Sequence, residues 1–112
     1  MNGYFVLDAR GEPIEEKDFT TWTRWFEQAD RSVSRTDVAP QVTVLTTFSG
    51  YDPHANGGTP RLFEARVLGG VLDGEESRHV SKAEALRAHA ALVAWCRVGA
   101  SANWGVRAED VE

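Results

Sequence analysis

Cysteine is almost absent from this sequence, because Cys96 is the only one among 112 residues. A single cysteine cannot form a disulfide within the chain, which fits a reducing compartment such as the cytoplasm. Residues 1–11 lack a basic leader followed by an apolar run, so we predict no signal peptide. No stretch approaches the ~18 consecutive apolar residues that a membrane-spanning helix needs. We therefore expect a cytoplasmic protein that does not use a membrane.

An excess of basic residues is lacking as well. The chain has 12 Lys and Arg residues against 17 Asp and Glu residues, which gives a net charge of −5. Binding to the phosphates of nucleic acid or to an anionic membrane needs Lys and Arg, so this balance argues against both as partners. The acidic residues are interspersed with arginine rather than grouped in runs, which argues against a mimic of nucleic acid.

The sequence does contain the apolar mass for one core. Apolar residues make up 42% of the chain, and they include four Trp and five Phe. A chain of this mass buries roughly 65% of its unfolded surface on folding. We predict one domain over residues 1–98 and a loosely ordered tail over residues 99–112. Trp104, in that tail, is expected either to be pinned to the domain or to be available to a partner.

Hydrophobic periodicity predicts the order β-α-β-β-β-β-α. The expected strands cover residues 4–7, 30–38, 42–48, 61–68 and 75–80. The first expected helix begins near residues 15–18 and ends near 29, and the second begins at 81 and ends near 97. Strands joined by short turns favour antiparallel pairing. We therefore predict an α+β fold, in which an antiparallel sheet of four to five strands carries both helices on one face.

The expected core faces follow from the same spacing. The first helix has an apolar stripe made of Phe19, Trp22, Phe26 and Ala29. Strand 42–48 has one face made of Val42, Val44, Thr46 and Phe48. The second helix is expected to bury Leu86, Ala90 and Val93, with Leu92 and Trp95 on a neighbouring face. Asp18 and Ser81 are expected to cap the two helix starts, and Gly99 to end the second helix.

Two groups of residues resemble a known family. The first is Trp22-x-x-Trp25-Phe26-Glu27-x-x-Asp30-Arg31 with Val33, Thr36 and Val38; the second combines Val44-x-Thr46-x-Phe48, Leu62-Phe63-Glu64, Gly69-Gly70-x-Leu72-Asp73 and Glu76-x-Arg78. Over residues 4–95 the chain resembles small uncharacterised proteins of tailed phages and prophages. The resemblance implies a phage or prophage origin and a common fold unit. It implies no activity and no active-site role.

The chain departs from the pattern of that family at several positions. Pro53 separates Asp52 from His54, where the family usually has Leu-Gly-Leu-Asp-His. Val71 replaces a turn residue, and His79 stands where an aromatic residue is common. The tail has no counterpart in the pattern.

The candidate binding surface is the loop of residues 49–60 together with the turn of residues 69–76. The loop is too long for a minimal hairpin turn, and loops held by a scaffold often carry function. The candidate binding residues are Tyr51, Asp52, His54, Asn56, Asp73 and Glu75. Because a meander of strands can send the two segments to opposite ends of the sheet, the surface is either one patch or two.

A first alternative is a small metal-dependent or hydrolytic enzyme centred on the loop. Asp and His are common ligands of divalent metals, and Asp52 and His54 could be joined by Asp73, Glu75 and His79. Asp, Pro, Asn and Gly are also the residues that turns require, so we favour a turn over a metal site. We predict no cofactor, and the metal question stays open.

A second alternative is a nucleic-acid-binding protein that uses Arg31, Arg35, Arg61 and Arg66. Ion pairs with acids such as Glu64 and Glu76 explain these arginines equally well, and we favour that interpretation. Cys96 is predicted to be a buried apolar residue rather than a nucleophile.

The function predicted from the sequence is that of a non-enzymatic phage or prophage accessory protein. We expect it to act in the cytoplasm of the bacterial host by binding a protein, such as a component of host machinery or host defence. A homodimer formed through a sheet edge or through the Trp104 tail is a further possibility.

Overall fold

The computed structural model describes residues 3–52 and 58–101, with side chains as far as residue 98. In chain order the elements are β1 (Phe5–Leu7), β2 (Pro13–Glu15), α1 (Phe19–Gln28), β3 (Ser32–Ala39), β4 (Val42–Phe48), β5 (Phe63–Leu68), β6 (Glu76–His79) and α2 (Lys82–Ser101). Strands β3 to β6 lie side by side in that order as an antiparallel sheet, and β1 and β2 form a second antiparallel sheet. The predicted α+β fold with an antiparallel sheet is confirmed.

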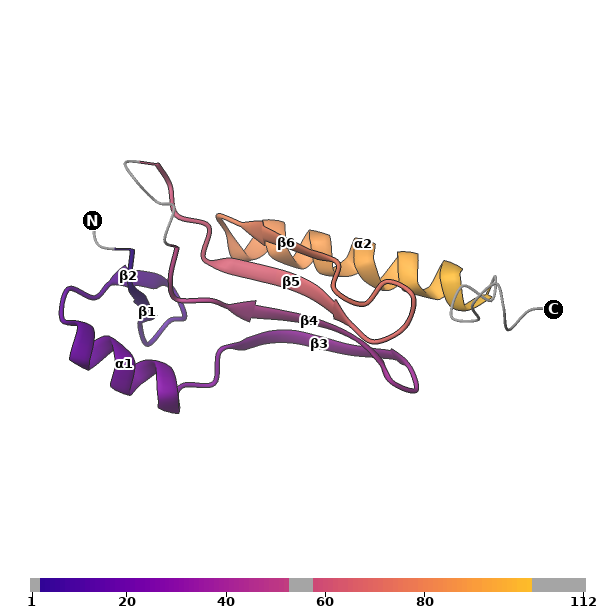
Figure 1. Ribbon diagram of the computed structural model, residues 1–112. Coiled ribbons are helices and arrows are strands. Elements are labelled where there is room, and N and C mark those ends of the chain that lie inside the picture. Colours follow the sequence, from indigo (N-terminus) through magenta and orange to yellow (C-terminus); the bar gives the residue numbers. More distant parts are fainter. Residues whose placement is uncertain (1–2, 53–57, 102–112) are drawn as a thin grey trace.

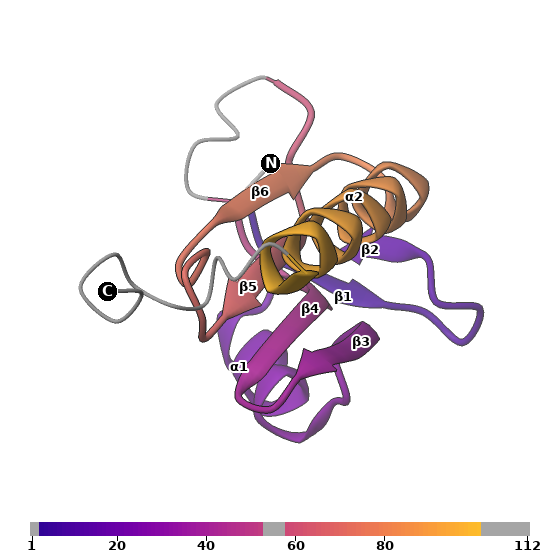
Figure 2. The same ribbon diagram turned by 90° about the vertical axis from the view of Figure 1, so that its right-hand side faces the viewer.

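Helix α2 covers one face of the four-stranded sheet. It contacts all four strands, and Figure 2 shows it lying in the concave side of the sheet. Helix α1 lies instead at one end of the sheet, against β1 (Figure 1). The prediction that both helices pack on one face is therefore wrong for α1. Only residues 29–31 separate α1 from β3, which keeps the helix near the end of the sheet, and α2 occupies the face.

The element order differs from the prediction by one strand. The additional strand is β2, which has three residues and pairs with β1. A tight turn joins the two strands, because Asp8 Oδ1 accepts the backbone N–H groups of Arg10 and Glu12 and Gly11 has a φ of +81°. A strand of three residues is too short to show an alternating hydrophobic pattern, and its extended conformation depends on pairing with β1.

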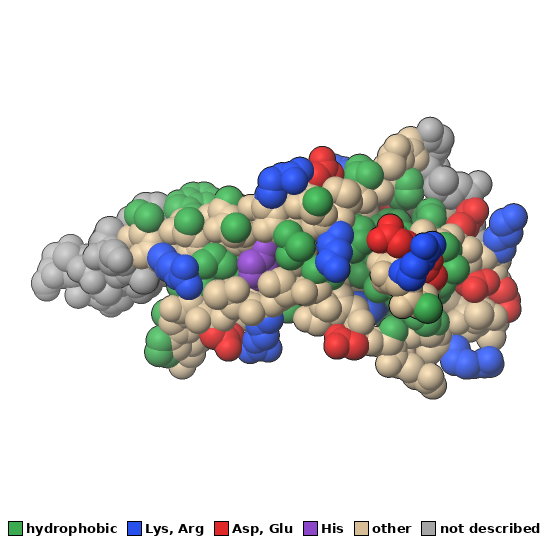
Figure 3. All heavy atoms as spheres, turned by 180° about the vertical axis from the view of Figure 1, so that it is seen from behind, with side chains coloured by type: hydrophobic (Ala, Val, Ile, Leu, Met, Phe, Trp, Pro, Cys, Tyr) green, Lys and Arg blue, Asp and Glu red, His purple; other side chains and the backbone are tan. Residues whose placement is uncertain are grey.

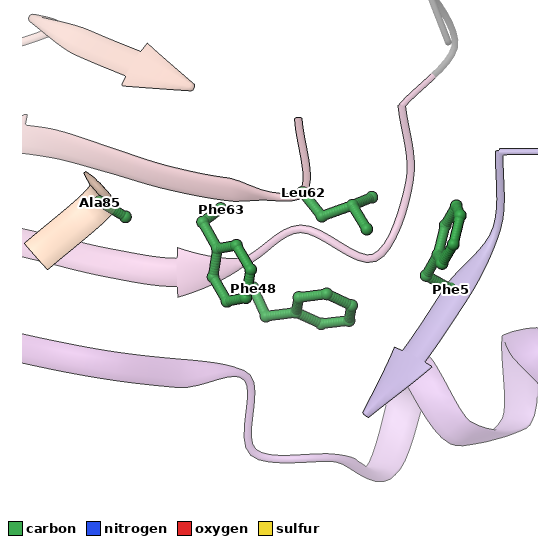
Figure 4. Close-up of a cluster of buried hydrophobic side chains, with 5 residues drawn as sticks. All are labelled: Phe5, Phe48, Leu62, Phe63 and Ala85. Atoms are coloured by element: carbon green, nitrogen blue, oxygen red, sulfur yellow. The ribbon is translucent and has the colours of Figure 1, made fainter. Parts of the chain in front are cut away.

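The core contains two apolar clusters on the covered face of the sheet. The first consists of Phe5, Phe48, Leu62, Phe63 and Ala85 (Figure 4). The second consists of Val44, Val67, Val93 and Cys96. The predicted face of β4 is confirmed, because Val44, Thr46 and Phe48 are fully buried. The first cluster connects β1 with the main sheet and α2, so both sheets share it.

The buried line of α2 differs from the prediction. It consists of Ala85, His89, Val93 and Cys96, whereas Leu86, Ala90 and Trp95 are exposed. Alanines lie all round this helix, so its hydrophobic pattern does not mark the face that packs.

Both helices begin at the predicted caps, but α2 ends later than predicted. Asp18 Oδ1 accepts the backbone N–H of Thr20 at 3.3 Å, and Ser81 Oγ accepts that of Glu84 at 3.1 Å. Helix α2 continues past Gly99 to Ser101, since a glycine inside a helix costs only about 1 kcal/mol relative to alanine. Residues 102–112, with Trp104, lie outside the described residues, and the loosely ordered tail stays a prediction.

We expect Gly69→Ala to destabilise the protein more than Gly74→Ala. Both glycines have a positive φ, +88° and +92°, so a side chain strains the backbone at both positions. At Gly69 the new Cβ would also overlap the carbonyl oxygen of Gln41, whereas at Gly74 nothing lies within 4 Å. The overlap should add about 1–3 kcal/mol to the loss in the free energy of unfolding. Urea denaturation measures the difference, and equal losses in the two variants would contradict this packing.

Candidate functional site

The candidate site lies at the end of the molecule where β1, α1 and the segment after β4 meet. Residues 3–5 and 50–52 run antiparallel there. The backbone N–H of Phe5 donates to the Gly50 carbonyl at 2.8 Å, and that of Asp52 donates to the Gly3 carbonyl at 3.1 Å. An isolated bridge pairs Tyr4 with Tyr51 between these two bonds. The loop predicted to carry function therefore starts from a fixed backbone.

Trp22 fastens α1 to this segment. Its indole Nε1–H lies 3.0 Å from the Phe5 carbonyl oxygen and 3.1 Å from the Gly50 carbonyl oxygen. Gly50 has a φ of +74°, and a Cβ atom there would lie 3.2 Å from the Phe5 carbonyl oxygen and 3.5 Å from Trp22 Nε1. The position therefore requires glycine, both for its backbone conformation and for the close approach of the indole.

Around Trp22, five aromatic rings form what we call the ring cluster: Tyr4, Phe19, Trp22, Phe26 and Tyr51. Tyr4 and Tyr51 stack with centroids 4.7 Å apart and planes 17° from parallel. Desolvation, with the neighbouring Tyr51, raises the pKa of the Tyr4 phenol. Phe19 is 56% exposed. None of the α1 residues is buried, so the predicted core stripe of this helix, Phe19, Trp22, Phe26 and Ala29, is wrong. The ring cluster is a half-buried aromatic surface.

Arg31 closes the other end of the ring cluster. Its guanidinium carbon lies 3.9 Å from the centroid of the Phe26 ring, and Nη1 donates to the Phe48 carbonyl at 3.0 Å. A cation over an aromatic face is attracted by the quadrupole of the ring. Arg31 therefore joins α1 to the end of β4.

The predicted binding residues Tyr51 and Asp52 both belong to this end. Tyr51 is part of the ring cluster. Asp52 is only 5% exposed, and its Oδ2 accepts the backbone N–H of Arg61 at 2.8 Å. This bond holds together the two ends of the segment between residues 52 and 61. His54 and Asn56, the other two candidates from the loop, lie outside the described residues.

The predicted binding residues Asp73 and Glu75 lie elsewhere, in the turn between β5 and β6. Asp73 Oδ1 accepts the backbone N–H of Gly69 at 2.7 Å, and Glu75 is exposed. Because β5 runs away from the loop, its far end and this turn lie at the opposite end of the sheet (Figure 1). The loop and the turn therefore form two separate patches and not one, which were the two arrangements that the sequence left open.

The four arginines proposed for nucleic acid binding are spread over the fold. Arg66 pairs with Glu64 at 3.6 Å and with Glu76 at 3.4 Å. Arg35 pairs with Asp37 at 3.2 Å. Arg31 lies over the Phe26 ring, and Arg61 follows the loop, where its backbone N–H donates to Asp52. The ion-pair interpretation of Arg66 is confirmed.

A buried histidine, which the hydrophobic pattern does not mark, lies in the body of the fold. His89 is 6% exposed and lies between the two apolar clusters. Its Nδ1 is 2.8 Å from Thr46 Oγ1, and its Nε2 is 2.9 Å from Thr36 Oγ1 and 3.5 Å from Ser34 Oγ. Thr46, the one polar residue on the predicted apolar face of β4, is the signal that could have located it. Thr46 is fully buried, and the pair holds α2 to the sheet.

Cys96 lies in the second apolar cluster, as predicted. Burial raises the pKa of its thiol, which keeps it in the unreactive protonated form. Within the described ranges, no group of three or more His, Cys, Asp or Glu residues is placed to hold a metal ion. The metal-dependent enzyme needs His54 and stays a prediction from the sequence.

Comparisons with known proteins add no relative. No family model, curated protein or solved structure matches this chain. Among the described helices, none is long and apolar enough to cross a membrane. Strands β3 and β6 are the edges of the four-stranded sheet, and a homodimer through such an edge stays a prediction.

We expect the free energy of unfolding to decrease as the pH falls below about 6.5. Burial lowers the pKa of His89 in the folded protein, so the unfolded chain takes up this proton at a higher pH. The contribution of His89 to the free energy of unfolding is therefore complete at a pH above the pKa that this histidine has in the unfolded chain. It is lost as the pH falls from there towards the lower pKa that His89 has in the folded protein. Denaturant titrations across this range measure the slope. His89→Gln should reduce it and Cys96→Ala, on the same buried face, should keep it; an unchanged slope in His89→Gln would contradict the assignment.

We expect Asp52→Ala to destabilise the loop. The substitution leaves the backbone N–H of Arg61 without its acceptor, which costs about 1–3 kcal/mol in the free energy of unfolding. Glu75→Ala, which removes an exposed carboxylate, should change it by less than about 0.5 kcal/mol. Thermal melting and the rate of proteolysis within residues 53–60 report the two effects. Equal behaviour of both variants would show that Asp52 does not hold the loop.

Proposed function

We propose that this chain is an accessory protein of a tailed phage or prophage that acts in the bacterial cytoplasm by binding a protein of the host. The proposal places the binding surface at the end formed by the ring cluster and residues 49–60. The resemblance of residues 4–95 to phage and prophage proteins supports the origin. The residues of its first motif also build this end: Trp22 fastens α1, and Arg31 lies over Phe26.

The observation that carries the proposal is the half-buried aromatic surface itself. Phe19 is 56% exposed, and the rings of Tyr4 and Tyr51 stack beside it. Aromatic residues and arginine are enriched at the centres of protein interfaces, where they supply contact area at a small cost in side-chain entropy. A partner that covers Phe19 would remove this ring from water.

The segment of residues 49–60 provides the second part of the surface. Its ends are fixed by the bond from the Arg61 N–H to Asp52 and by the stacking of Tyr51 on Tyr4. Ser49 Oγ donates to the Leu62 carbonyl at 3.0 Å, and Arg78 donates to the Tyr51 carbonyl at 3.0 Å. A loop whose ends are held in this way presents its side chains from a rigid scaffold, which lowers the entropy lost on binding.

A pull-down from a bacterial lysate tests the proposal. We expect the tagged protein to capture one host protein in stoichiometric amount. Phe19→Ala, and replacement of residues 53–59 by a Gly/Ser stretch of equal length, should each reduce capture at least about fivefold, as for a hot-spot loss above 1 kcal/mol. Asp52 and Arg61 stay unchanged in the loop variant so that its ends remain held.

Val98→Ala is the matched control, because Val98 is 57% exposed but lies on α2. It should capture as much as the unmodified protein. No captured protein, or a protein retained by the Phe19 and loop variants but lost with Val98→Ala, would contradict the proposal.

A further inference from the structure

The outer surface of α1 carries an open groove next to the ring cluster. Its volume is about 320 Å3, and its lining residues all come from α1: Phe19, Thr20, Thr23, Arg24 and Glu27. Trp25, which packs on Phe48, lies on the opposite side of the helix, since successive residues turn by about 100°. The groove therefore faces away from the core and joins the ring cluster at Phe19.

Among the lining residues, Phe19 offers the apolar surface that a ligand can reach, since this residue is 56% exposed. The Thr23 hydroxyl is shielded from solvent and has no hydrogen-bond partner among the described residues. A shielded hydroxyl without a partner costs free energy, but because it is closed to solvent we count it as no contact for a ligand.

The net negative charge of residues 1–31 favours a positively charged ligand. Residues 1–31 contain seven acidic and four basic residues, a net charge of −3, whereas residues 32–101 contain seven of each and are neutral. Figure 3 shows acidic and basic side chains intermixed over the end that carries β1, β2 and α1, so the negative balance of residues 1–31 comes from their numbers and not from a separate acidic patch. Glu27 brings one of these carboxylates into the groove. Opposite charge on a partner steers association and fixes its orientation.

This end already contains the contact that a cationic ligand would make. Arg31 lies over the Phe26 ring, with its guanidinium carbon 3.9 Å from the centroid. Phe19, seven positions earlier, offers a second ring to the solvent. We infer that the groove receives a Lys- or Arg-bearing segment of the protein partner, with the cation over Phe19 and close to the Glu27 carboxylate. The inference rests on the proposed function and specifies the chemistry of its partner.

Nuclear magnetic resonance titration with a defined probe tests this inference. The probe is N-acetyl-arginine-N′-methylamide, and its neutral citrulline analogue is the control ligand. We expect the arginine probe to shift the signals of Phe19, Thr23 and Glu27, and the citrulline analogue to bind more weakly. Phe19→Ala should weaken binding of the arginine probe about two- to fivefold, the range of an exposed cation–π contact. Val71→Ala, a control at a residue that is 55% exposed in the distant turn, should not change the affinity.

The two charged residues of the groove, Arg24 and Glu27, test whether the groove favours a positively charged ligand. Glu27→Gln should weaken binding of the arginine probe, and Arg24→Gln, which removes the cation of the groove, should strengthen it, each by about twofold as for exposed charges. Opposite signs, equal binding of the citrulline analogue, or shifts that lie outside the groove would overturn the inference. If the pull-down captures a host protein through Phe19 but the arginine probe does not bind, the proposed function stands. Only the cationic ligand is then rejected.

Discussion

The indole of Trp22 is the contact on which the candidate site depends. One N–H group lies within hydrogen-bond distance of two carbonyl oxygens, those of Phe5 and Gly50, and so joins α1, β1 and the segment that follows β4. A buried indole N–H requires an acceptor, and here it finds both in chain segments that would otherwise be separate. The absence of a side chain at Gly50 makes this approach possible. The ring cluster, Tyr51 and the start of the loop all take their positions from this junction.

His89 has the corresponding role in the body of the fold. It lies between the two apolar clusters, and its ring nitrogens contact hydroxyls from β3 and β4. Ala65, buried opposite Thr46 on β5, leaves space for a ring at this level of the core. An apolar helix surface can slide on a sheet, whereas a polar group that needs particular partners fixes one register. The sheet and α2 thus form a fixed scaffold, and the candidate site lies at its end and uses none of the His89 contacts.

Local features were predictable from the sequence, and contacts between distant segments were not. Strand β4 is recognisable from its alternation and the two helix starts from Asp18 and Ser81, because each signal lies within a few residues. The binding role of the loop stays a prediction, and the role of Asp52 depends on a backbone group at Arg61. The ring cluster was not predictable, since Tyr4 and Tyr51 meet only in the folded chain. The buried face of α2 was missed because its alanines hide the period.

Site-specific photo-crosslinking in bacterial cells tests most directly whether the ring cluster is the binding surface. A p-benzoylphenylalanine residue would replace Phe19 in one variant and Val98 in another, since both positions are exposed to a similar degree. The account predicts a discrete crosslinked product with a host protein from position 19 and none from position 98. A product from position 98 alone would place the binding surface on α2 and contradict the account.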